Sequence, residues 1–222
     1  MSARALFLLS PASTSGRRAR ILLAPQARFE LAERVRSGEG APIGEVFSFL
    51  SGLYFRGKIG YARRFGQFPG AVRIITSDRG LVPPELAVTV TDLTEMAASA
   101  IDAANARYTG PFERDAARLA ASLGPVDRVI LLGSIATGKY ADLLRPVLAD
   151  RLVFPSQFVG RGDMSRGGLL LRAVDAGTEL EYVPVFRERV GVAGDRRDWN
   201  PGSSWVMQRV AAWLVASRSS CG

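Results

Sequence analysis

The segment Phe158–Arg172, F-V-G-R-G-D-M-S-R-G-G-L-L-L-R, gathers residues that could bind or transform an anionic or heteroaromatic ligand. Its glycines allow close approach of backbone to a ligand. Arg161 and Arg166 can each make paired hydrogen bonds to a carboxylate, a phosphate or a base edge. Asp163 can accept a proton or orient a substrate, and Ser165 adds a hydroxyl. The alternative interpretation is a tight turn into a helix that Asp163 or Ser165 caps.

A second glycine-containing segment, Gly133–Tyr140, reads G-S-I-A-T-G-K-Y and nearly fits the phosphate-binding pattern G-x-x-x-x-G-K-[ST]. Tyr140 replaces the serine or threonine that would hold magnesium, which argues against a P-loop ATPase. Backbone N–H groups at a helix start, together with Lys139, could still bind an anion; otherwise the segment is a plain strand–helix turn. The candidate ligand contacts here are Gly133, Ser134, Thr137 and Lys139.

Two further polar loops follow predicted strands. Ser10–Arg18, S-P-A-S-T-S-G-R-R, could hold a phosphate or a carboxylate, or could be a surface loop. Its candidate contacts are Ser10, Ser13 and Arg17. Ser77–Leu86 places Asp78 just after a strand, where a carboxylate can act as a base or orient a substrate. The alternative role of Asp78 is that of a turn residue.

Aromatic and basic residues alternate in the segment Tyr54–Phe65. Such a pattern is typical of surfaces that stack bases and bind phosphates, and equally of an amphipathic helix with a basic solvent face. The candidate nucleic-acid contacts are Tyr54, Arg56, Lys58, Arg63 and Arg64.

The absence of histidine limits the chemistry of these 222 residues. Serine–histidine–aspartate catalysis, cysteine–histidine catalysis and histidine-ligated metal sites are excluded. The single cysteine, Cys221, excludes a disulfide within one chain. Acid–base work therefore falls to Asp, Glu, Lys or Tyr, to substrate groups or to water, and we expect no metal and no other cofactor.

Net charge and hydrophobicity limit the classes of binding partner and the cellular location that we expect. The net charge of +8 points to an anionic small molecule, RNA or DNA, although arginine richness can also reflect genome composition. Hydrophobic residues make up 47% of the chain, enough for a large core, yet no apolar run approaches the ~20 residues of a membrane span. We expect a cytoplasmic protein without a membrane partner.

Apolar runs alternate with helical periodicity along the chain. Strands are predicted at Ala5–Ser10, Ala71–Thr76, Val126–Leu132, Leu152–Phe154 and Leu180–Val185. Helices are predicted at Arg28–Arg36, within Val46–Phe65 as two segments, after Asp92 with Glu95 as a capping box, from Pro111 to Leu123, at Tyr140–Ala149 and at Gly168–Ala176. This alternation predicts a Rossmann-like α/β fold, a three-layer sandwich with a mainly parallel sheet of about five strands.

The same pattern predicts one α/β domain over residues 1–190, followed by a linker and a C-terminal amphipathic helix over residues 191–222. In open α/β sheets, ligands bind beyond the carboxyl ends of the strands. The four polar loops described above all follow strands, so we expect them to meet at one edge and form a single pocket.

Four segments resemble the core α/β domain of archaeosine synthase and related proteins of deazaguanine RNA and DNA modification. They read L-L-S-P-A-S-T, L-Y-F-R-G-K-I-G-Y-A, I-I-T-S-D-R-G-L-V-P-P-E-L and I-L-L-G-S-I-A-T-G-K-Y. The resemblance implies nucleobase chemistry. Ala12 and Gly16 stand where that family has cysteine and lysine, so its amide-forming chemistry is absent here or proceeds differently.

The leading hypothesis is an enzyme acting on a nucleobase- or nucleoside-like substrate, including 7-deazaguanine in RNA or DNA, by glycosidic or amine-transfer chemistry. Asp163 would transfer a proton or bind the base edge, Lys139 would stabilise negative charge and Asp78 would orient the substrate. The alternatives are a non-catalytic nucleic-acid-binding module and an enzyme that binds nucleotides or phosphorylated metabolites through Gly133–Lys139.

Overall fold

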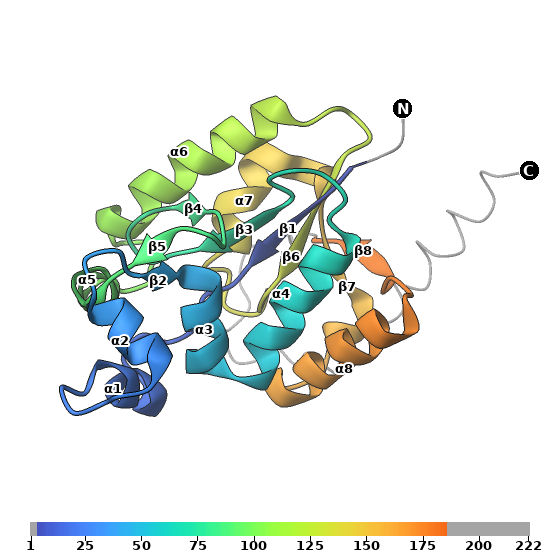
Figure 1. Cartoon of the computed structure of the whole chain (residues 1–222). Coiled ribbons are helices and arrows are strands. Elements are labelled where there is room, and N and C mark those ends of the chain that lie inside the picture. The colour runs from blue at the N-terminus through green and yellow to red at the C-terminus, as the bar shows by residue number, and fades with distance from the viewer. Residues whose placement is uncertain (1–3, 186–222) are drawn as a thin grey trace, which may run out of the picture.

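A six-stranded sheet lies at the centre of the computed structural model, which describes residues 4–185 (Figure 1). The strand order is β4-β3-β1-β6-β7-β8. The strands are β1 (Ala5–Leu9), β3 (Val72–Ile75), β4 (Leu81–Val82), β6 (Arg128–Leu132), β7 (Leu152–Pro155) and β8 (Tyr182–Pro184). Strands β3, β1, β6 and β7 run parallel, whereas β4 and β8 are antiparallel to their neighbours. The prediction of a mainly parallel sheet is confirmed.

The two central strands, β1 and β6, are apolar along almost their whole length because both faces of the sheet are covered. They pair in parallel with Phe7 opposite Ile130 and Leu9 opposite Leu132. All four of these side chains are fully buried. The buried pair of strands fixes where each chain segment leaves the sheet, and so fixes the start of the loops that follow.

Helices cover both faces of the sheet (Figure 1). Helices α4 (Leu53–Phe65) and α8 (Asp163–Ala176) lie on one face, and α6 (Ala106–Ser122) and α7 (Ala141–Leu148) lie on the other. The three-layer Rossmann-like α/β architecture is therefore present. None of the helices within residues 4–185 is long and apolar enough to cross a membrane.

The remaining elements gather at one end of the sheet (Figure 1). They are α1 (Arg17–Leu23), α2 (Glu30–Arg36), α3 (Ile43–Ser51), α5 (Val90–Ala98) and the two-stranded sheet of β2 (Ala41–Pro42) and β5 (Ala87–Val88). Short 3₁₀ turns, η1 (Ala149–Arg151) and η2 (Ser156–Phe158), flank β7. The predicted linker and helix over residues 191–222 lie outside the described residues.

Several predicted boundaries are wrong for identifiable reasons. Helix α6 begins at Ala106 with Asn105 as its cap, so Pro111 lies inside the helix. The capping box of α5 joins Thr89 to Asp92, one turn before the predicted pair. Helix α8 begins at Asp163 and not at Gly168, because the glycines that looked like a loop belong to a helix packed closely on α4.

Candidate functional site

The four polar loops leave the same edge of the sheet, because the four strands that precede them are adjacent and parallel. Along the chain, β1 is followed by β3 on one side and later by β6 on the other. The boundary between β1 and β6 is therefore the point where the strand order reverses, and doubly wound sheets bind ligands there. Ser10 follows β1 and Gly133 follows β6 at this boundary.

Ser10 and Gly133 pack against each other at the reversal point. The backbone N–H of Ser10 donates to the Leu132 carbonyl at 3.2 Å, and its hydroxyl lies 3.3 Å from the same oxygen. A Cβ built on Gly133 would lie 2.9 Å from Ser10 Cβ and 3.2 Å from Ser10 Oγ. Only glycine at position 133 leaves room for the serine side chain.

We expect Gly133→Ala to lower the free energy of unfolding by about 1–3 kcal/mol, because the new methyl group overlaps the Ser10 side chain. Chemical denaturation measures the loss. Gly60→Ala is the matched control, since a Cβ at Gly60 within α4 meets nothing within 4 Å. Equal stability of the two variants would contradict the close packing at the reversal point.

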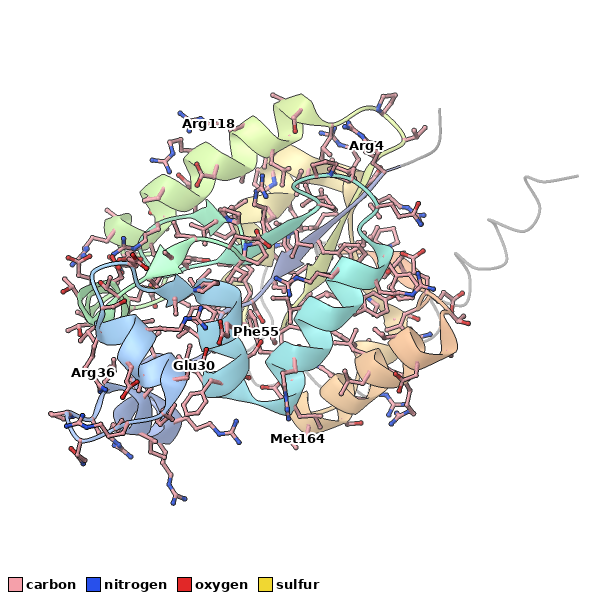
Figure 2. All side chains as sticks on the ribbon, viewed as in Figure 1. Arg4, Glu30, Arg36, Phe55, Arg118 and Met164 are labelled. Carbon is pink, nitrogen blue, oxygen red and sulfur yellow. The ribbon has the colours of Figure 1, made fainter. Side chains whose placement is uncertain are left out.

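Lys58 is the central polar group of this edge. It lies on α4 with 1% of its surface exposed. Its Nζ donates to the Ser10 carbonyl at 2.5 Å and lies 2.9 Å from Ser10 Oγ. Lys58 Nζ also lies close to two aromatic rings, 4.4 Å from the centroid of the Tyr54 ring and 4.9 Å from the centroid of the Phe55 ring. Figure 2 shows Phe55 in the interior of the molecule. Within residues 4–185, Lys58 has no carboxylate at ion-pairing distance.

The surroundings of Lys58 disfavour its charged form. Burial is the main cause that lowers the pKa of Lys58 to about 7; the negative charge of Asp163 opposes this change, and the positive charge of Arg166 adds to it. A lysine with this pKa exists as both free amine and ammonium near neutral pH. It can therefore accept and return a proton, which an exposed lysine does poorly.

Helix α8 brings a second set of polar groups to Lys58. Arg166 donates through Nε and Nη2 to the Phe158 carbonyl, at 3.2 and 3.1 Å, and its guanidinium lies 5.3 Å from the Phe158 ring centroid. Asp163, the first residue of α8, is exposed and lies 3.8 Å from Arg166 Nη1. Arg161 is exposed and donates to Ser165 Oγ at 3.2 Å.

The hydroxyl of Tyr54 is buried and makes no hydrogen bond of normal geometry with another described residue, although Arg166 lies close enough to act on it. Burial raises the pKa of Tyr54 to about 12, and the Arg166 charge partly offsets this rise. Burial also raises the pKa of Tyr140, with the charges of Tyr54 and Asp163 adding to the effect. A hydroxyl that stays protonated and unpartnered in the interior is a donor available to a ligand.

Two glycines allow α4 and α8 to approach closely enough to build this cluster. A Cβ on Gly57 would lie 2.7 Å from the Gly167 carbonyl oxygen. A Cβ on Gly167 would lie 2.8 Å from the Tyr54 Cα. The close contact places Lys58 and Tyr54 of α4 beside the residues at the start of α8.

Asp78 belongs to a different neighbourhood. Its side chain is 6% exposed, and Oδ1 lies 3.6 Å from Arg79 Nε without a hydrogen bond to a described residue. Burial raises the pKa of Asp78, and the charges of Arg79 and Arg107 oppose that rise. Arg79 also pairs with Asp92 and Glu95 of α5. These contacts join the turn after β3 to α5, and none of them involves Lys58 or Asp163.

Groups of the protein itself contact the positions at which the Gly133–Tyr140 loop was expected to bind an anion. The Asp142 carboxylate lies directly against Gly138, which has a positive φ of 68°, and it pairs with Arg145, so a protein ion pair already occupies the start of α7. The Lys139 carbonyl accepts a hydrogen bond from Tyr108 at 2.8 Å, and Lys139 Nζ lies 5.2 Å from the Tyr140 ring centroid. Ser134 Oγ accepts from Ala136 N at 3.3 Å, whereas Thr137 is exposed.

The remaining predicted contacts separate into buried and exposed groups. Tyr54 and Lys58 are buried, so they lie inside the cluster and not on an open nucleic-acid-binding surface. The residues Arg56, Arg63 and Arg64 of α4, and Ser13 and Arg17 after β1, are exposed. Arg63 Nη2 lies 3.4 Å from Glu85 Oε1. Sequence reasoning assigned Lys58 to phosphate binding and missed its burial.

No family model, curated protein or solved structure shows a significant match to this chain. The geometry around Lys58 is therefore the basis for a functional proposal.

Proposed function

We propose that this chain is an enzyme that acts on a nucleobase- or nucleoside-like substrate at the carboxyl ends of β1 and β6, with Lys58 as the group that accepts and returns a proton. The observation that carries the proposal is the burial of Lys58 at this edge, against Ser10 and two aromatic rings, without a carboxylate at ion-pairing distance among the described residues. Burial of an ionisable group without a counter-ion destabilises a fold, and such groups concentrate at functional sites.

The substrate class follows from what surrounds the amine. The buried rings of Tyr54 and Phe158 lie 6.5 Å apart, and Arg166 rests on Phe158, so aromatic rings and cationic donors lie close to the amine. Heteroaromatic rings favour aromatic neighbours, and they carry ring nitrogens and exocyclic groups that can exchange protons. The resemblance of four segments to deazaguanine-modifying proteins supports the same class, as does the net charge of +8 for a substrate within RNA or DNA.

The proposal gives each nearby residue a role. Lys58 in its amine form accepts a proton from the substrate, and in its ammonium form it returns one to the product or leaving group. The Tyr54 hydroxyl donates a hydrogen bond to a substrate oxygen or nitrogen. Asp163 accepts hydrogen bonds from the polar edge of the base, and Arg166 binds that edge and any phosphate of the substrate. Both glycosidic and amine-transfer reactions are consistent with these roles.

Calorimetric titration of guanine, 7-deazaguanine, adenine and their nucleosides tests the proposal. We expect at least one of them to bind, and Lys58→Met to weaken that binding about 10- to 100-fold, because the variant leaves a ligand polar group unpaired. Arg172→Met is the charge-matched control, since Arg172 is an exposed cation farther along α8. Absence of binding to the unaltered chain, or equal affinity of Lys58→Met, would contradict the proposal.

A non-catalytic nucleic-acid module makes different predictions. Its affinity for a short oligonucleotide would fall steeply with salt, because released counterions drive such binding. It would also be insensitive to Lys58→Met, since Lys58 is buried and the exposed arginines would carry the contacts. Salt titration of both proteins with one oligonucleotide separates the two functions.

A further inference from the structure

The hydroxyl of Ser10 lies between the Leu132 carbonyl, which always accepts, and Lys58 Nζ, which accepts only as a free amine. Oγ is 2.9 Å from Lys58 Nζ and 3.3 Å from the Leu132 carbonyl oxygen. As an ammonium, Lys58 donates to Oγ, and the hydroxyl hydrogen points to Leu132. As an amine, Lys58 has a lone pair that accepts the hydroxyl hydrogen, while an N–H still donates to the Ser10 carbonyl.

The serine is the more accessible member of this pair. Ser10 is 7% exposed, whereas Lys58 is 1% exposed and enclosed by Tyr54 and Phe55. The residue after Ser10 is Pro11, which has no N–H, so the hydroxyl has no donor from the next peptide unit.

We propose that Ser10 is a nucleophile activated by Lys58, and that the pair transfers an acyl group from an ester- or amide-like substrate to an amine or to water. In a chain without histidine, a lysine held as a free amine is the base that a serine nucleophile requires. The inference rests on the proposed function, because Lys58 moves the proton in both.

The steps balance without a cofactor. Ser10 Oγ attacks the carbonyl carbon, its proton passes to Lys58 Nζ, and the carbonyl electron pair moves to oxygen. The resulting tetrahedral intermediate expels the leaving group, which takes the proton from Nζ, and an O-acyl serine remains. An amine or a water molecule then attacks the acyl carbon and gives its proton to Nζ, and Ser10 leaves with that proton restored.

Covalent labelling of the full chain with phenylmethanesulfonyl fluoride tests the pair, because the reagent forms a sulfonyl-serine with loss of fluoride. We expect one adduct, mapped by peptide mass spectrometry to Ser10. It should be absent in Ser10→Ala and retained in Ser15→Ala, a control in an exposed serine of the same loop. In Lys58→Met the labelling rate should fall at least about 100-fold.

The pH dependence of labelling gives a readout that does not depend on the folding of any variant. In the unaltered chain the rate should rise with an inflection near pH 7, where Lys58 loses its proton. No adduct, an adduct at another residue, or a rate independent of pH would overturn the proposal. Labelling uses no nucleobase, so its failure with nucleobase binding intact rejects the Ser10–Lys58 pair alone, and the reverse result rejects the substrate class alone.

Discussion

Lys58→Met should make the fold more stable at pH 6 and almost unchanged in stability at pH 10. Burial lowers the pKa of Lys58 to about 7, against 10.5 for the unfolded chain. Below pH 7 the folded protein carries a buried ammonium, which costs free energy that a methionine of similar length does not. The expected gain at low pH is on the order of a few kcal/mol.

The direction in which the stability changes with pH follows from proton binding to Lys58. Between pH 7 and pH 10.5 the unfolded chain holds a proton on Lys58 that the folded chain has lost, so the stability of the unaltered protein rises with pH across this window. The slope is about 1.4 kcal/mol per pH unit in the middle of the window. The variant lacks this contribution, so its advantage shrinks as pH increases.

Urea denaturation of both proteins at pH 6, 8 and 10 measures the difference. Arg172→Met serves as the control for loss of one positive charge, since this exposed side chain should change stability by less than about 0.5 kcal/mol at each pH. A constant difference between Lys58→Met and the unaltered chain across the three pH values would mean that Lys58 titrates like an exposed lysine.

Gly167→Ala should lower the free energy of unfolding by about 1–3 kcal/mol or more and should weaken ligand binding as well. The added methyl group would lie 2.8 Å from the Tyr54 Cα and 2.9 Å from the Leu53 carbonyl oxygen. Both atoms belong to the backbone of α4, which cannot move away without shifting the whole helix. Separation of α4 from α8 would carry Tyr54 and Lys58 away from Arg166.

The neighbouring glycine provides the control. A Cβ on Gly168 would approach only Arg172 Nη1, at 3.3 Å, and that atom is the end of a flexible side chain. Gly168→Ala should therefore be neutral or slightly stabilising, because alanine favours a helix interior over glycine by about 1 kcal/mol. Thermal melts of the two variants give the comparison, and similar midpoints would contradict the close packing of α4 on α8.

The layers of the fold were predictable because they follow from patterns within short windows. The apolar residues within Ala5–Ser10 and Val126–Leu132 predicted buried strands of a mainly parallel sheet, and the chain order of strands and helices predicted the three layers. Helix α1 and the β2–β5 pair were not predicted. Helix α1 spans only seven residues and has no capping side chain, and each strand of the pair has two residues.

The candidate site was predictable only in part. The four loops do share one edge, as the strand pattern indicated. The burial of Lys58 was missed because lysines are mostly exposed, and whether one is buried depends on what packs over it. The spacing of residues in α4 could have indicated this burial. Lys58 follows Tyr54 by four residues and precedes Tyr61 by three, which places it on the apolar stripe of α4. The residue that pairs with Lys58, Ser10, lies 48 residues earlier in the chain, and helix α8, which packs against α4, lies more than 100 residues later.

The outermost strands of the large sheet have a consequence for self-association. Within residues 4–185 the sheet ends in β4, with two residues, and in β8, with three, of which Pro184 has no N–H to donate. Long, flat outer strands act as templates on which another molecule can extend a sheet and begin to aggregate, whereas very short or proline-containing ones do not. This sheet therefore offers neighbouring molecules little unpaired backbone, and copies of the chain are discouraged from joining strand to strand.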